Sequence, residues 1–129
     1  MSNRNICKFI TETSRDKLEI RRFIYETDEK IITSERTINH HRCILVKNGC
    51  GTFTIDEKTL DFSVGSLIFV FSGEKMIINP NGKCELMYID FLGARSGVLF
   101  SRFGITKFSR LYNSFDGLIP LWYDSLCRA

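Results

Sequence analysis

The most regular feature of the chain is an alternation of apolar and polar positions between residues 18 and 91. Residues 52–55 and 60–64 alternate strictly, a pattern that predicts two strands with one buried face each. In the second strand the buried face would carry Leu60, Phe62 and Val64. The sequence therefore favours β structure over most of its length.

Turn signals separate these apolar segments at short intervals. They include Asn48-Gly49, Ser72-Gly73 and residues 79–82, which read Asn-Pro-Asn-Gly. Residues 67–71 are apolar at every position, as in a strand covered on both faces. Further strands are expected at residues 18–25, 42–47 and 84–91. Short strands about every 8–12 residues predict a sandwich or a closed barrel.

After residue 91 the spacing of apolar residues changes from two to three or four. This helical spacing is shown by Val98, Leu99, Phe103, Phe108, Leu111 and Phe115. It predicts one or two helices behind the barrel. Pro120 can begin a further helix. Residues 121–129 have helical composition without a capping signal, so we expect this helical segment to be cut at Ala129.

Composition and charge narrow the class of protein. The chain has 129 residues, 43% of them hydrophobic, which is typical of one soluble domain. A net charge of +3, from 18 basic and 15 acidic residues, is too small to predict nucleic-acid binding. The longest apolar run is far shorter than the ~20 residues of a membrane span. The first 16 residues are polar and resemble no secretion signal, so we expect a cytoplasmic protein with no membrane partner.

The five cysteines form no closely spaced pair. The shortest separation, between Cys43 and Cys50, is longer than metal or redox motifs use. We therefore expect buried, reduced thiols that act as small hydrophobic residues.

Residues 65–76 resemble the second sequence motif of the cupins. Gly65 and Gly73 match the glycines of that motif, whereas Phe71, Met76 and Pro80 stand where its Pro, His and Asn would be. Upstream, residues 47–53 resemble the glycine turn that closes the first cupin motif. The resemblance implies a mainly β fold, a cupin-like double-stranded β-helix or jelly-roll barrel followed by C-terminal helices.

The same resemblance identifies the metal ligands that this chain lacks. The position of the metal-binding glutamate falls on Arg42, whose guanidinium offers no lone pair, and Met76 offers only a thioether. The adjacent His40 and His41 would point to opposite faces of a strand and cannot share an interior ion. We therefore expect no metal, no cofactor and no catalytic residues, and hence no enzyme.

The metal-free motifs resemble the N-terminal domain of arabinose-regulator (AraC) type transcription factors. Residues 87–93, ending in Phe-Leu-Gly, resemble the last strand of that domain, and residues 98–105 resemble the helix after it. The resemblance implies an arm at residues 1–17, a barrel at 18–93 and a trailing helical segment at 94–129, cut before or within dimerisation helices. It implies a regulatory domain that binds a small-molecule effector, forms a homodimer and contacts DNA only through a C-terminal part absent from this chain.

Residues 103–111 superficially resemble a helix-turn-helix around Gly104. However, Arg110 stands where the recognition helix needs a buried aliphatic residue, and Phe100 stands where it needs a small one. We therefore interpret this basic stretch as the solvated face of a helix.

Strand alternation gives the candidate ligand-binding residues. The set comprises Arg42, Ile44, Met76, Ile78, Leu86 and Tyr88, with Arg36 added by the resemblance. Arg42 inside a barrel should meet a carboxylate, phosphate or hydroxyl; if the register is wrong by one residue it is a surface arginine instead. The apolar lining favours an amphipathic effector with an anionic or polar end.

Two other functions remain open at this point. The barrel could be filled by its own side chains and serve only for dimerisation, or the chain could be a small stand-alone cupin enzyme. A filled interior and tight self-association indicate the first, and a bound metal indicates the second.

Overall fold

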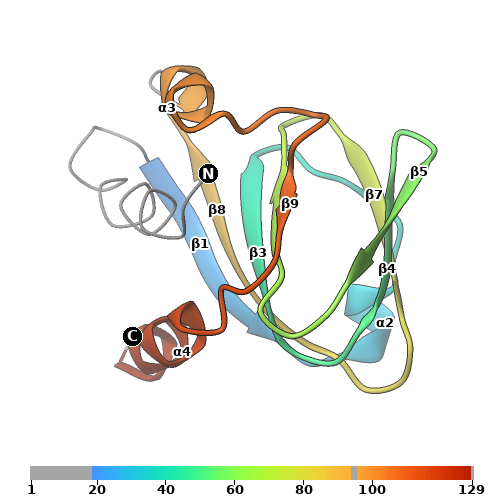
Figure 1. Ribbon diagram of the computed structural model, residues 1–129. Helices are drawn as coiled ribbons and strands as arrows, with labels where there is room; N and C mark the ends of the chain where they lie inside the picture. Colours follow the sequence, from blue (N-terminus) through green and yellow to red (C-terminus); the bar gives the residue numbers. More distant parts are fainter. Residues whose placement is uncertain (1–18, 94–95, 129) are drawn as a thin grey trace.

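The computed structural model describes residues 19–93 and 96–128, so the predicted arm at residues 1–17 lies outside the described residues. Two antiparallel sheets face each other (Figure 1). The first sheet has the order β1 (Glu19–Glu26), β8 (Glu85–Leu92), β3 (His41–Asn48), β6 (Leu67–Val70) and β9 (Leu111–Tyr112). The second has the order β2 (Arg36–Thr37), β7 (Lys75–Pro80), β4 (Gly51–Ile55) and β5 (Lys58–Phe62). Within the described ranges the helices are α2 (Glu29–Ile32), α3 (Ser96–Phe103) and α4 (Leu118–Arg128).

The strand pairs are nested along the chain. β3 pairs with β8, and β4, which follows β3, pairs with β7, which precedes β8. This nesting wraps one long hairpin into two facing sheets, which is the jelly-roll arrangement. The predicted fold class is confirmed: the protein is mainly β, a small cupin-like barrel followed by C-terminal helices.

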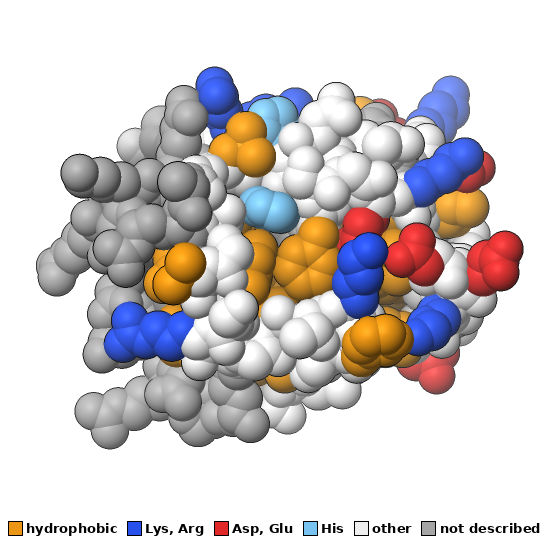
Figure 2. Space-filling view, turned by 90° about the horizontal axis from the view of Figure 1, so that it is seen from above, with side chains coloured by type: hydrophobic (Ala, Val, Ile, Leu, Met, Phe, Trp, Pro, Cys, Tyr) orange, Lys and Arg blue, Asp and Glu red, His pale blue; other side chains and the backbone are white. Residues whose placement is uncertain are grey.

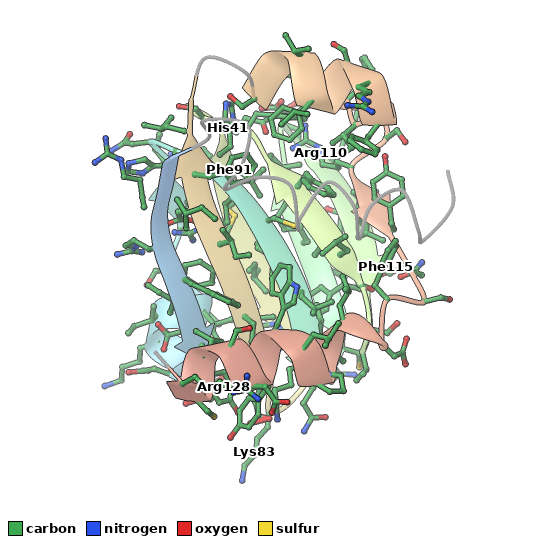
Figure 3. All side chains as sticks on the ribbon, turned by 90° about the vertical axis from the view of Figure 1, so that its left-hand side faces the viewer. His41, Lys83, Phe91, Arg110, Phe115 and Arg128 are labelled. Atoms are coloured by element: carbon green, nitrogen blue, oxygen red, sulfur yellow. The ribbon has the colours of Figure 1, made fainter. Side chains whose placement is uncertain are left out.

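The first sheet is covered on both faces. Leu67 and Phe69 of β6 belong to a cluster on its outer face, whereas Ile68 and Val70 belong to the cluster inside the barrel. All four residues of β6 are buried, as the apolar run predicted. On the outer face, α3 lies across one end of the sheet and α4 across the other (Figure 3).

Helix α4 is fixed to the sheet by aromatic contacts. The ring of Trp122 meets that of Phe23 edge-on, with 5.5 Å between centroids, and Tyr123 meets Tyr25 in the same way. Pro120 lies in the first turn of the helix, where its missing N–H leaves no hydrogen bond unmade. Neither α3 nor α4, nor any other described helix, is long and apolar enough to span a bilayer.

Two sequence expectations need correction, and one helix was not expected. Residues 108–115 are not helical: Leu111 and Tyr112 form β9, which pairs with Ile68 and Leu67 at the edge of β6. Leu111 packs inward and Tyr112 outward, so their apolar spacing reflects two faces of a sheet. Val64 does not share the buried face of β5, because that strand ends at Phe62 and Val64 is 42% exposed in the turn beyond it. Helix α2 has no counterpart in the predicted elements.

The expectation that residues 103–111 form no helix-turn-helix is confirmed. After α3 ends, Thr106 and Ser109 pair as an isolated bridge in a tight turn, and β9 follows. The basic residues of the stretch do not lie on one solvated helix face, however, because Arg110 is buried.

A buried ion pair holds this returning segment against the barrel. Arg110 donates two hydrogen bonds of 2.8 Å to the carboxylate of Glu74, and the carboxylate also accepts the N–H of Phe71. The two side chains are only 3% and 5% exposed. Burial alone would raise the pKa of Glu74, but the hydrogen bonds from Arg110 and Phe71 outweigh it and hold the pKa below its usual value.

Replacing Arg110 should therefore be severe. Arg110→Met leaves the Glu74 carboxylate buried without its partner, so we expect a loss of about 3–5 kcal/mol in the free energy of unfolding, measured with urea. Arg102→Met, an exposed arginine on α3, is the matched control and should change stability by less than about 0.5 kcal/mol. Equal effects of the two variants would contradict the assigned role of the pair.

Candidate functional site

The predicted inward-facing residues lie together inside the barrel. Ile44 comes from β3, Met76 and Ile78 from β7, and Leu86 and Tyr88 from β8, and all five are members of the inner cluster. The alternation of apolar and polar residues therefore predicted the correct strand faces. Ligand binding by these residues remains a prediction.

Arg42 is buried at the edge of this cluster, with 7% of its surface exposed. Its Nε and Nη2 donate to the two carboxylate oxygens of Asp90 at 2.6 and 2.9 Å, and its guanidinium carbon lies 4.0 Å from the centre of the Tyr88 ring. The alternative of a surface arginine is thus wrong, and the expected carboxylate partner comes from the protein itself. Arg22, half exposed on β1, adds a second contact to Asp90 at 3.4 Å.

Of Arg36, the structure describes only the backbone. Its backbone lies in β2, opposite Met76 of β7. Its side chain lies outside the described residues, so its predicted contact with an effector stays a prediction.

The cavity beside the predicted residues is very small. A cavity of about 20 Å³ adjoins Arg42, Ile44, Met76, Leu86 and Tyr88 on one side and α2 on the other. Ile78 does not line it. This volume accommodates about one water molecule and no organic effector.

A larger pocket of about 600 Å³ opens at the same end of the barrel. Ile32 of α2 lines both this pocket and the small interior cavity. The other lining residues are Thr27, Glu29, Asn48, Pro80, Gly82, Lys83, Cys84 and Glu85. Ile32, which is 5% exposed, therefore separates the outer pocket from the barrel interior.

The histidines that precede Arg42 take no part in an interior site. His40 lies in a bend, and His41 is the first residue of β3. The His41 ring lies among Phe71, Phe91 and Phe100, close to α3 (Figure 3), and its Nδ1 accepts the N–H of Ser72. Burial lowers the pKa of His41. The Glu74 carboxylate acts in the opposite direction, and the neighbouring His40 lowers the pKa further.

The donor set for a cupin metal does not fit. Across residues 19–93 and 96–128, no three His, Cys, Asp or Glu side chains are placed to hold an ion. At the positions of the motif the chain supplies a guanidinium already paired with Asp90 and a buried thioether, neither of which binds the metals that cupins use.

The cysteines follow the expectation only in part. Cys43 and Cys84 are buried, but Cys50 and Cys127 are exposed, and all four are free thiols. Cys7 lies outside the described residues. Burial raises the pKa of Cys43 well above its usual value and that of Cys84 to about 11, so neither is a thiolate near neutral pH.

Two residues of this site escaped the sequence analysis in their actual role. Neither Asp90 nor Arg22 was among the predicted site residues. The register places Arg22 and Arg42 opposite Asp90 on its two neighbouring strands. An acidic residue on the last inward position of β8 was the available signal for this pairing.

The Arg42–Asp90 pair can be tested by a double-mutant cycle. Arg42→Met alone leaves Asp90 buried and should cost about 3–5 kcal/mol of unfolding free energy in urea. Combining it with Asp90→Leu removes the stranded charge, so the double variant should recover most of that loss. Strictly additive losses would contradict a direct, buried interaction.

His41 predicts a pH dependence of stability. Because its pKa is lower in the folded protein than the ordinary value of about 6.5, its contribution is complete above that pH and is lost as the pH falls toward the folded-state pKa. Urea unfolding at about pH 7.5 and about pH 5, above the ordinary carboxyl range, should show a loss that His41→Gln reduces. If His41→Gln leaves the loss unchanged, the assignment to His41 is wrong.

Comparison with known proteins gives structural similarity only. No protein-family model and no curated protein matches the sequence. Among solved structures, the Clostridium difficile EutQ protein is 20% identical with a TM-score of 0.46, and the match covers 62% of this chain and 60% of that one. A predicted oxalate decarboxylase from Thermotoga maritima is 18% identical with a TM-score of 0.49, over 64% of this chain and 74% of that one. The match to Bacillus subtilis oxalate decarboxylase OxdC covers 64% of this chain and 30% of the other, at 17% identity and a TM-score of 0.43.

These findings correct the expected family. The similar structures named above are EutQ and oxalate decarboxylase proteins and not effector domains of the arabinose-regulator type, and on this finding the assignment to that type is wrong. The motifs on which it rested contain turn glycines such as Gly65 and Gly73, both at positive φ, and inward-facing strand residues. A jelly-roll barrel of any function needs such residues, and they specify the fold without specifying a regulator.

Proposed function

We propose that this chain is a non-catalytic interaction domain, in which a filled cupin-like barrel serves as a rigid scaffold for protein association. The observation that carries the proposal is the Arg42–Asp90 pair. Asp90 neutralises Arg42, the charged residue among the predicted ligand-binding residues of the interior. The cavity beside the pair has a volume of only about 20 Å³.

The hydrogen bonding of the buried polar atoms supports the same proposal. Among the described residues, no buried side-chain nitrogen or oxygen lacks a hydrogen-bond partner. Sites that recognise a polar ligand hold donors or acceptors that the ligand completes. Here those groups are already occupied by the protein, so recognition is transferred to its surface.

The exposed free thiols favour a reducing compartment for this function. Cys50 and Cys127 are exposed and unpaired with each other, which is compatible with a reducing environment such as the cytoplasm. In an oxidising compartment, exposed free thiols would be prone to unwanted disulfide formation.

A second candidate function, small-molecule binding, is favoured by the position of Ile32. This side chain stands between the pocket of about 600 Å³ and the interior cavity. Displacement of α2, a single helical turn, would join the two spaces beside Met76 and Tyr88. The ligand would then be amphipathic, with its apolar part inside.

Native mass spectrometry of the purified chain, combined with elemental analysis, separates these functions. For an interaction domain we expect the mass of the chain or a multiple of it, with neither a co-purified organic molecule nor stoichiometric metal. An organic mass retained by the wild type but lost in Ile32→Trp would replace the proposal with ligand binding. Stoichiometric iron, manganese or zinc would replace it with a metalloenzyme.

A further inference from the structure

The most exposed large apolar side chain among the described residues is Phe108, at 87%. It stands at the tip of the turn between Thr106 and Ser109. The Thr106 hydroxyl oxygen accepts the N–H groups of both Phe108 and Ser109 at 3.1 Å, which fixes the backbone of the turn. The aromatic ring is therefore presented to solvent by a defined structure, with only the Lys58 ammonium above it at 4.5 Å.

A groove of about 350 Å³ lies directly beside Phe108. It separates β5, the edge of the second sheet, from β9, the edge of the first. Its apolar lining is supplied by Ile55, Leu60, Leu111 and Phe108 itself. Arg110 also lines it, but its charge is neutralised by Glu74. The surface thus combines a projecting aromatic ring with an apolar groove.

Charges of both signs line this groove. Asp56 lies in the turn between β4 and β5, Lys107 lies next to Phe108, and Lys58 begins β5. Among the described residues neither Asp56 nor Lys107 forms an ion pair. Figure 2 shows this end of the molecule, where acidic and basic side chains surround exposed hydrophobic ones.

We propose that this surface, defined as Phe108, Lys107, Asp56 and the groove, binds a second copy of this chain about a two-fold axis. A two-fold axis brings the same patch of both copies together. This patch has a projecting ring and a groove, and it has charges of both signs. It is therefore complementary to itself in shape and in charge. Phe108 of each copy enters the groove of the other, the two rings stack, and each Lys107 faces the Asp56 of its partner.

A surface with charges of one sign, or one without a groove, would not favour binding of a second copy. A different partner could bind through the groove alone or through one charge alone. Self-association uses the projecting ring, the groove and both charges together. The inference rests on the proposed function, because it names the partner and the surface through which the domain associates.

Sedimentation equilibrium of the full chain tests the inference. The wild type should dimerise in the micromolar to submillimolar range, and Phe108→Ser should weaken dimerisation by roughly thirtyfold or more, as expected for a central aromatic residue. Leu121→Ser is the matched control: Leu121 is 63% exposed on α4 and should leave the dimer unchanged. Thermal unfolding of each variant checks that the fold is retained.

Chemical crosslinking gives a second, independent measurement. A zero-length carbodiimide should join the Lys107 amine to the Asp56 carboxylate in an equimolar mixture of unlabelled and ¹⁵N-labelled protein. Peptides with one labelled and one unlabelled half show that the bond joins two copies. Lys107→Met should remove this crosslink without altering the fold, which keeps the test decisive even if Phe108→Ser is unstable.

The outcomes separate this inference from the proposed function. A wild-type dimer that survives Phe108→Ser and yields no mixed Lys107–Asp56 crosslink overturns the surface assigned here and leaves an interaction domain standing. A chain that stays monomeric to its solubility limit overturns self-association. A bound organic molecule or metal in native mass spectrometry overturns the proposed function, whatever the state of Phe108.

Discussion

The burial of Arg42 between the two sheets is the constraint on which the rest of the barrel depends. A guanidinium cannot lose its charge, so its burial requires a carboxylate in fixed geometry. Asp90 meets this requirement from the residue directly opposite Arg42 in the β3–β8 ladder. Since a slip of one residue would send the two side chains to opposite faces, the pair also fixes the register of these central strands.

The pair also changes what the cupin-like architecture can do. In such a barrel the inward positions of β3, β7 and β8 are where polar ligands for an ion or substrate would converge. Here they carry Ile44, Met76, Leu86 and Tyr88 around an internally neutralised arginine. The interior is thereby a packed core, which is why we propose that the outer edges and turns of the barrel meet other molecules.

Much of this arrangement could be predicted from the sequence, because strand alternation and turn glycines are local signals. They gave the two-sheet fold, the inward faces and the helix α3. The elements that were missed are short and owe their structure to distant contacts. β9 has two residues and exists because it pairs with β6, and α2 is one turn long with Ile32 packed into the barrel end.

The functional prediction had a different weakness. The Gly65–Met76 motif describes a barrel, and the residues at its ligand positions do not say what the barrel does. Identifying Asp90 as the partner of Arg42 required the register of β3 against β8, which the turns fix only approximately. The exposure of Phe108 was not predictable either, since its spacing with Leu111 and Phe115 imitates a helix.

The pairing of β9 with the edge of β6 has a consequence for the order in which the chain folds. Glu74 and Arg110 are 36 residues apart, and β1 joins the sheet only by pairing with β8. During synthesis, β6 and β7 therefore leave the ribosome well before the segment that neutralises Glu74 and covers the edge of β6. Sequence-distant pairing of this kind slows folding and leaves strand edges open to other chains. The nascent barrel remains an incomplete sheet until residues 110–112 emerge.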